Sequence, residues 1–224
     1  MKKTRHLMIV IAAAVILLSI GAVGAYAGLT DDATPPVTTS DVATSYAGDV
    51  IFQISSTDAE GVAYVYHRFD KGVAGLYTVA TETVSPAVQI TVPTEKDTKL
   101  SIGTHTVKFW AQDVNGNVEA QNTATFTVNP ALTLARSASV VVAGKYFTLS
   151  GALRPAGVYK VVVQAKKPGA SAFKTLTTRT TDAEGAYSYR YRTSTEGTWS
   201  FRAQFTDAKT ALSATSATVK LRVK

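Results

Sequence analysis

Short runs of alternating apolar and polar residues recur along most of this 224-residue chain, after an N-terminal stretch that is continuously apolar. The runs are rich in Val, Thr, Tyr and Phe and are separated by Gly, Asp, Asn, Ser and Pro, a pattern that is typical of short β-strands. In the first half, the pattern predicts strands at Val37–Ser40, Val50–Ser55, Val62–Phe69, Leu76–Ala80, Val88–Val92, Thr104–Gln112 and Thr123–Val128. In the second half, it predicts strands at Leu132–Leu134, Ser139–Val142, Tyr146–Leu153, Tyr159–Lys166, Phe173–Arg179, Ala186–Tyr191, Thr198–Phe205 and Thr215–Val223. Seven or eight short strands in about 95 residues are the expected content of an all-β sandwich.

The N-terminal residues 1–27 have the composition of a targeting segment. Three basic residues precede the apolar run LMIVIAAAVILLSIGAVGAYA, which ends in the A-x-A pattern at Ala25 and Ala27. This arrangement is typical of a secretory signal peptide that is cleaved after Ala27. The run is also long enough to cross a bilayer as an uncleaved signal-anchor helix with its basic end inside. Either outcome places residues 28–224 outside the cytoplasm, secreted or held in the plasma membrane by residues 7–27.

The two halves of the chain carry opposite charge. Residues 31–130 include 12 acidic and 5 basic side chains, whereas residues 131–224 include 4 acidic and 15 basic ones. Such a split predicts two domains, an acidic one at 37–129 and a basic one at 131–224. A polar tether over residues 28–36 precedes them and ends in consecutive prolines, which hold the chain extended. Because the chain has no cysteine, disulfide scaffolds, thiol nucleophiles and cysteine zinc sites are all excluded.

The pentapeptide TDAEG occurs twice, at Thr57–Gly61 and at Thr181–Gly185. The two copies are 124 residues apart, whereas FWAQ at Phe109–Gln112 and FRAQ at Phe201–Gln204 are 92 apart, which matches one domain length. The pentapeptides therefore do not occupy equivalent positions in the two domains. Asp bonds to nearby backbone and Gly tolerates a positive φ, so the repeat predicts two tight turns and not a ligand site used twice.

Several segments of the first half resemble a known family of bacterial repeats. Residues Gly103–Glu119 read GTHTVKFWAQDVNGNVE and look like the final hairpin of a bacterial Ig-like repeat. Pro35–Ser40 and Asp58–Ala63 resemble the entry strand and the second connection of that family. Tyr66–Asp70 is similar to its turn approach, with Lys71 where a glycine is usual.

The second half is similar to another bacterial Ig-like class through shorter segments, TLSG at Thr148–Gly151, TDAEGAYSY at Thr181–Tyr189 and GTWSFRA at Gly197–Ala203. The resemblance implies two tandem Ig-like β-sandwiches of the exported or cell-surface type, which serve as spacers, adhesive modules or appendages to enzymes. Neither half has the Cys…Trp…Cys spacing of antibody domains, so the kinship extends only to the sandwich.

Residues with catalytic potential are few and lie on predicted core faces. His105 shares one strand face with Val107 and Phe109, and His67 lies in the same way beside Phe69, so both histidines are expected to be half-buried on a core face and bonded to backbone. The sequence has no G-x-S-x-G elbow, no H-E-x-x-H pair and no phosphate-binding glycine loop. We therefore expect no enzymatic activity and no cofactor.

A calcium site is a weaker alternative in the connection after residue 112. Asp113, Asn115, Asn117 and Glu119 present oxygen ligands at alternate positions, as hard cations prefer. The segment departs from the EF-hand pattern, with Val118 in the place of the glycine and the glutamate too early. A strand connection rich in Asn and Gly needs no metal to explain it, so no metal is expected.

Aromatic and basic residues supply the candidate ligand contacts. Trp110 is expected to face outward from its strand, where it covers a neighbour or stacks on a sugar ring. In the second half, alternation places aromatic side chains inward and basic ones outward. The outward candidates for an anionic wall polymer, an acidic glycan or a membrane surface are Arg190, Arg192, Arg202, Lys166, Lys167 and Lys174.

The sequence thus predicts a non-enzymatic extracytoplasmic protein that acts as a surface spacer or adhesive element. The alternative is a binding module for carbohydrate or an anionic cell-wall polymer. The expected partners are a cell-wall polymer, a glycan or another surface protein, with no specific nucleic acid. Membrane contact is expected only through the N-terminal segment, if it stays uncleaved.

Overall fold

The computed structural model describes residues 32–72, 75–83, 86–92 and 100–224. The regular elements in these residues are β-strands, which confirms the all-β prediction. No helix in the described part is long and apolar enough to cross a membrane. The predicted signal or anchor at residues 1–27 lies outside the described residues. Ala33–Lys224 form one compact unit that contains every strand listed below.

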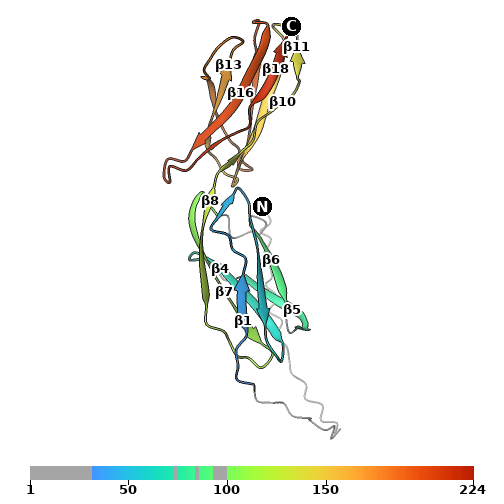
Figure 1. Cartoon of the computed structure of the whole chain (residues 1–224), viewed down its shortest axis with the longest axis vertical. Coiled ribbons are helices and arrows are strands. Elements are labelled where there is room, and N and C mark those ends of the chain that lie inside the picture. The colour runs from blue at the N-terminus through green and yellow to red at the C-terminus, as the bar shows by residue number, and fades with distance from the viewer. Residues whose placement is uncertain (1–31, 73–74, 84–85, 93–99) are drawn as a thin grey trace, which may run out of the picture. The chain divides into compact units, whose positions relative to one another are not determined.

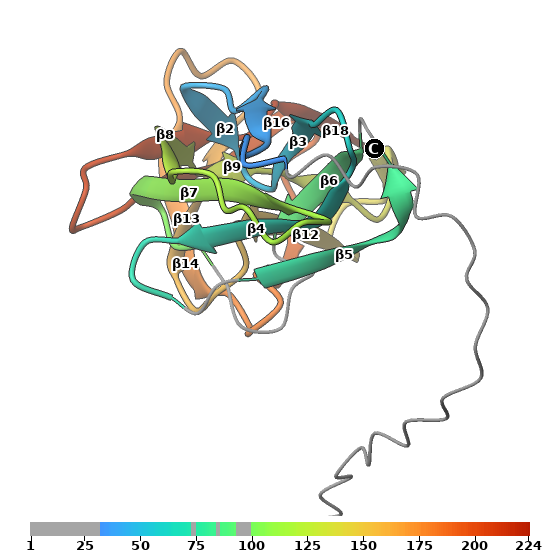
Figure 2. The same ribbon diagram turned by 90° about the horizontal axis from the view of Figure 1, so that it is seen from below.

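The first pair of sheets is built from strands between residues 37 and 129. One sheet has the order β1-β3-β6, with bounds Val37–Ser40, Val50–Thr57 and Ala87–Val92. The other has the order β2-β8-β7-β4-β5, with bounds Ser45–Ala47, Asn122–Asn129, Gly103–Asp113, Val62–Phe69 and Gly75–Thr83. The pairings are antiparallel except for β2 with β8, and β7, β4 and β5 lie side by side in Figure 2.

Alternation along each strand fills the core between these two sheets. On β3, Val50, Phe52 and Ile54 are buried while the residues between them are exposed. The ring of Phe69 lies edge-to-face against Phe52 at 6.0 Å and against Phe126 at 6.3 Å. The period of two therefore separates a packed inner face from a polar outer face, as expected for a sandwich.

The second pair of sheets is built from strands between residues 131 and 223. One sheet has the order β10-β12-β15, with bounds Ala135–Arg136, Tyr146–Arg154 and Ala186–Arg192, and β9 (Ala131–Leu132) also pairs with β12. The other has the order β11-β18-β16-β13-β14, with bounds Val140–Val141, Val219–Val223, Gly197–Thr206, Lys160–Lys166 and Lys174–Thr180. A short strand, β17 (Ser213–Thr215), pairs with β16, and β13, β16 and β18 are labelled in Figure 1.

Aromatic side chains dominate the core of the second sandwich. Trp199, Phe201 and Phe205 of β16 are buried, as the alternating pattern predicted. The indole of Trp199 stacks on Phe201 at 6.0 Å, and Phe147 meets the same Phe201 ring edge-to-face at 5.6 Å. Tyr187 of β15 is also buried, and its hydroxyl donates to the Thr133 carbonyl at 2.5 Å.

Burial of Tyr187 raises the pKa of its hydroxyl above the ordinary value of 10.0. The folded state therefore favours the neutral phenol, so its stabilising contribution is complete below pH 10.0 and is lost as the pH rises toward the folded pKa. We expect the thermal midpoint of the second sandwich to fall less steeply above pH 10.0 in Tyr187→Phe than in the unmodified chain. Thermal unfolding followed at a series of alkaline pH values measures this slope. The half-exposed Tyr146→Phe is the control, and equal slopes for the two variants would contradict the expectation.

Both copies of the repeated pentapeptide form turns, as predicted. Asp58 Oδ1 accepts hydrogen bonds from the amides of Glu60 and Gly61, at 3.0 and 3.1 Å. In the second copy, Asp182 Oδ1 accepts from the amides of Glu184 and Ala186, at 3.1 and 2.8 Å. The closing glycines have φ of 119° and 79°, a backbone region that other residues rarely adopt.

The structure corrects the predicted strands at two kinds of place. The single strand predicted at Thr215–Val223 is wrong, because the chain leaves the β17 pairing at Ser216 and enters β18 only at Val219. Ser216 is buried there, and its amide still donates to the Ala203 carbonyl at 2.9 Å. Its hydroxyl accepts from the Ala203 amide at 2.9 Å, so a side chain supplies one bond that a regular strand pair would make with backbone. The strands β2 and β10 were missed, since two or three residues are too short to show alternation.

Candidate functional site

Trp110 faces outward from β7 and stacks on Tyr66 of β4. The two residues are direct partners in the β4–β7 register, and their rings are 5.1 Å apart with an angle of 6° between planes. Tyr64 adjoins Tyr66 at 6.2 Å, so three partly exposed aromatic side chains share this surface. We call Tyr64, Tyr66 and Trp110 the aromatic face. Because stacking occupies only one side of each ring, part of the aromatic surface stays available to a ligand.

Polar groups surround the aromatic face. The Tyr66 hydroxyl donates to Gln112 Oε1 at 3.1 Å, which fixes the orientation of both side chains. The next pair on the same outer face of these two strands is Arg68 with Lys108, which are direct partners in the register. Neither cation forms an ion pair within the described ranges. An outward surface with stacked rings, an amide and cations offers ring faces and hydrogen-bond donors together.

The basic candidates of the second sandwich do not form one surface, because they lie on opposite sheets. Arg190 and Arg192 project outward from β15, whereas Arg202 and Lys166 project outward from β16 and β13. Lys167 follows β13 in the connection to β14. Alternation along the strands predicted that these five basic residues lie outside the core. It could not show which of the two sheets carries each of them.

Arg190 and Arg192 converge on Tyr146. The two guanidinium carbons lie 4.0 and 5.2 Å from the centre of the Tyr146 ring, which is itself 49% exposed. Both arginines are exposed and neither forms an ion pair within the described part of the chain. We call Tyr146, Arg190 and Arg192 the arginine face. Two unpaired guanidinium groups held around one ring present planar donors to an anion.

Arg202 and Lys166 have a different environment. Both lie over the ring of Phe173, at 4.3 and 5.5 Å from its centre. The Arg202 Nε also donates to Gln164 Oε1 at 2.8 Å. These contacts hold the β13–β14 connection against the sheet, so the two cations have a structural use that the sequence did not reveal.

The calcium candidates use their oxygens in local hydrogen bonds. Asp113 is buried and accepts from the amide and the side chain of Asn117, at 2.8 and 2.7 Å. Glu119 accepts from the Thr38 amide at 3.0 Å and from Asn122 Nδ2 at 2.7 Å. The two carboxylates therefore serve different hydrogen-bond sets, and Asn115 is exposed in the turn between them.

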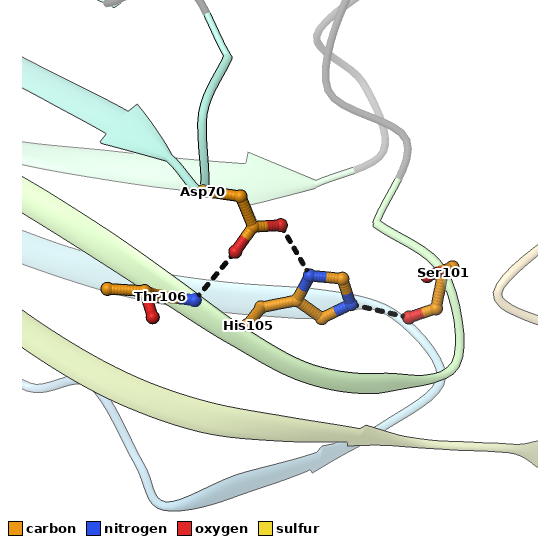
Figure 3. Close-up of polar contacts among 4 residues, drawn as sticks. All are labelled: Asp70, Ser101, His105 and Thr106. Carbon is orange, nitrogen blue, oxygen red and sulfur yellow. Dashed lines mark hydrogen bonds and ion pairs between the residues drawn. The ribbon is translucent and has the colours of Figure 1, made fainter. Parts of the chain in front are cut away.

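His105 is held on both sides of its ring, as Figure 3 shows. Its Nδ1 lies 2.7 Å from Asp70 Oδ2 and its Nε2 lies 2.8 Å from the Ser101 carbonyl. The second carboxylate oxygen of Asp70 accepts from the Thr106 amide at 2.9 Å. The backbone bond was expected, whereas Asp70 was not, because alternation along β7 does not show which residue at the end of the neighbouring strand β4 lies beside the ring. His67 lies on the core face as predicted and is more deeply buried than the half-buried position expected, so neither described histidine faces solvent.

Comparisons with known proteins give structural similarity only. No family model and no curated protein sequence matches the chain. Dimeric latent PorU from Porphyromonas gingivalis is 14% identical with a TM-score of 0.37, over 87% of this chain and 21% of that one. The tetra-tandem repeat in the extending region of a large adhesion protein is 21% identical with a TM-score of 0.38, over 85% of this chain and 50% of that one. The D00-D0 domain of intimin is 13% identical with a TM-score of 0.33, over 83% of this chain and 99% of that one.

This chain therefore spans about a fifth of PorU, since it covers 21% of that protein. All three TM-scores lie below 0.5, so the fold assignment rests on the sheets and cores described above.

Proposed function

We propose that this protein is a non-enzymatic extracytoplasmic module that acts as a spacer or adhesive element at the bacterial surface. One observation carries the proposal: both sandwiches enclose their cores and direct aromatic and cationic side chains outward. Surfaces of this kind suit contact with large polymers, which need an accessible face and no deep cleft. The basic leader and apolar run at residues 1–27 support a location outside the cytoplasm.

The environment of the histidines supports a non-enzymatic role. His105 has an acceptor at each ring nitrogen, and His67 is 2% exposed, so neither is placed to exchange a proton with a bound substrate. Among the described acids, Asp58, Asp113 and Asp182 accept hydrogen bonds within turns. These hydrogen bonds stabilise strand connections. Asp58 and Asp113 also lie close to Asp32, with one carboxylate oxygen of each within 4.8 Å of the others.

A second candidate function is a binding module for carbohydrate or an anionic cell-wall polymer. The aromatic face favours the former because ring faces contact the apolar faces of sugars. The arginine face favours the latter because its guanidinium groups match carboxylate and phosphate geometry. The two modes differ in their response to salt, since added salt screens exposed charges and leaves stacking largely intact.

Retention on insoluble material tests this function. We expect residues 28–224 to be retained on insoluble cell-wall or polysaccharide preparations at low salt. Trp110→Ala is expected to reduce retention on polysaccharide at both low and high salt. The double variant Arg190→Gln, Arg192→Gln is expected to reduce only the salt-sensitive part, so each variant is the matched control for the other. If the protein is retained neither at low salt nor at high salt, a binding role for both faces is contradicted.

A further inference from the structure

A pocket of about 310 Å³ opens at one edge of the second sandwich. Its walls come from the end of β13, the β13–β14 connection and the start of β14, together with two aromatic side chains of the core, Tyr191 and Trp199. The pocket lies apart from the aromatic face and the arginine face, whose residues do not line it.

The pocket exists because the two sheets end in strands that do not pair with each other. β14 pairs with β13 and is the edge of its sheet, and β15 pairs with β12 and is the edge of the other. Near the turn that joins them, Arg179 Nε donates to the Ser188 carbonyl at 3.1 Å and bridges the two edges. Toward the opposite end, the inner side of β14 supplies only the partly buried Leu176, so a pocket remains between the sheets at the edge of the core.

The inner wall is rigid and aromatic. Trp199 is 1% exposed, and its indole N–H donates to the Thr195 carbonyl at 2.9 Å. The same indole stacks on Phe201 and meets the Tyr191 ring edge-to-face at 6.2 Å. Because the ring positions are fixed by these contacts, the wall is formed before any ligand enters. Such a wall accepts an apolar ring or a short alkyl chain.

The mouth is cationic. Lys167 and Lys174 both line the pocket and both are exposed. Neither forms an ion pair with any residue that the structure describes. The surrounding segment, residues 131–224, has 15 basic and 4 acidic side chains, so the wider field has the same sign as the local one.

From this geometry, we propose that the pocket binds a small amphiphilic anion. Its apolar ring or short acyl chain contacts Tyr191, Trp199 and Leu176, and its carboxylate or phosphate lies between Lys167 and Lys174. The volume is at the lower end of the range of small-molecule sites, about 300–1,000 Å³, which fits one ring or short chain and excludes a whole polymer segment. The inference goes beyond the proposed surface role and does not depend on it.

Tryptophan fluorescence gives a direct test. The chain has two tryptophans, so residues 28–224 with Trp110→Phe report on Trp199 alone. Titration with decanoate below its micelle concentration is expected to change this signal saturably. Decyltrimethylammonium, which has the same chain length and opposite charge, is expected to bind at least tenfold more weakly.

Variants at the mouth and the wall locate the site. The double variant Lys167→Gln, Lys174→Gln is expected to weaken the affinity for decanoate about tenfold. The control Lys145→Gln, Lys160→Gln removes the same charge from exposed positions that do not line the pocket, and we expect it to leave this affinity unchanged. Leu176→Trp, which fills the pocket, is expected to abolish saturable binding. The proposal is overturned if the two decyl compounds bind equally, if the two lysine pairs have equal effects, or if decanoate leaves the signal unchanged.

Discussion

Truncation of Phe201 to alanine is expected to lower the free energy of unfolding of the second sandwich by about 3–5 kcal/mol. The ring is fully buried and contacts Trp199, Phe147 and Tyr191, so its removal leaves a cavity that aromatic neighbours cannot fill without moving. Chemical denaturation of residues 28–224 measures the change. Tyr146→Ala is the control, because this ring is 49% exposed and its loss is expected to cost about 1 kcal/mol or less.

The same experiment tests whether the two sandwiches unfold independently. Their cores consist largely of separate sets of side chains. Each sandwich carries one of the two tryptophans, Trp110 on the outer face of the first and Trp199 in the core of the second. We expect Phe201→Ala to shift the transition reported by Trp199 and to leave the one reported by Trp110 in place. A single transition that shifts as a whole in both single-tryptophan reporters would contradict two separate folding units.

Replacement of Gly185 by alanine is expected to destabilise the second sandwich by about 2–5 kcal/mol, the sum of left-handed strain and overpacking. Gly185 has φ of 79°, and a Cβ atom there would lie 2.3 Å from the Leu153 carbonyl oxygen. The Gly185 carbonyl also accepts from the Leu153 amide at 2.9 Å, so the turn cannot move away without losing a bond.

Gly144→Ala provides a matched control for this substitution. Gly144 has the same φ of 79°, but nothing lies within 4 Å of its hypothetical Cβ. We expect it to cost about 1–2 kcal/mol, the strain alone. Thermal or denaturant unfolding of both variants separates the backbone strain from the steric contact with Leu153. Equal losses of unfolding free energy in the two variants would show that this contact is unimportant.

The sequence predicts the strands well where alternation is long. Trp199, Phe201, Ala203 and Phe205 occupy every second position of β16, and all are buried. Prediction weakens where a segment is too short to establish a period, as in β2 and β10, or where a side chain supplies one bond of a strand pair, as at Ser216. Turns with their own chemistry, such as the two TDAEG segments, are predictable because their hydrogen bonds are local.

The candidate site was predictable only in part, because its contacts link residues that are distant in the sequence. Alternation placed Trp110 and Arg190 on outward faces, and both are there. It could not pair Trp110 with Tyr66, which depends on the register between β4 and β7. Nor could it show that Phe173 engages Arg202, or that two edge strands leave a pocket beside Trp199.

Location outside the cell is the premise on which the proposed surface role depends. The most direct measurement is treatment of intact bacteria with an added protease, followed by detection of this protein with an antibody against residues 131–224. The account predicts that the protein is degraded while a cytoplasmic marker stays intact. Protection of the protein until the cells are lysed would contradict a surface module.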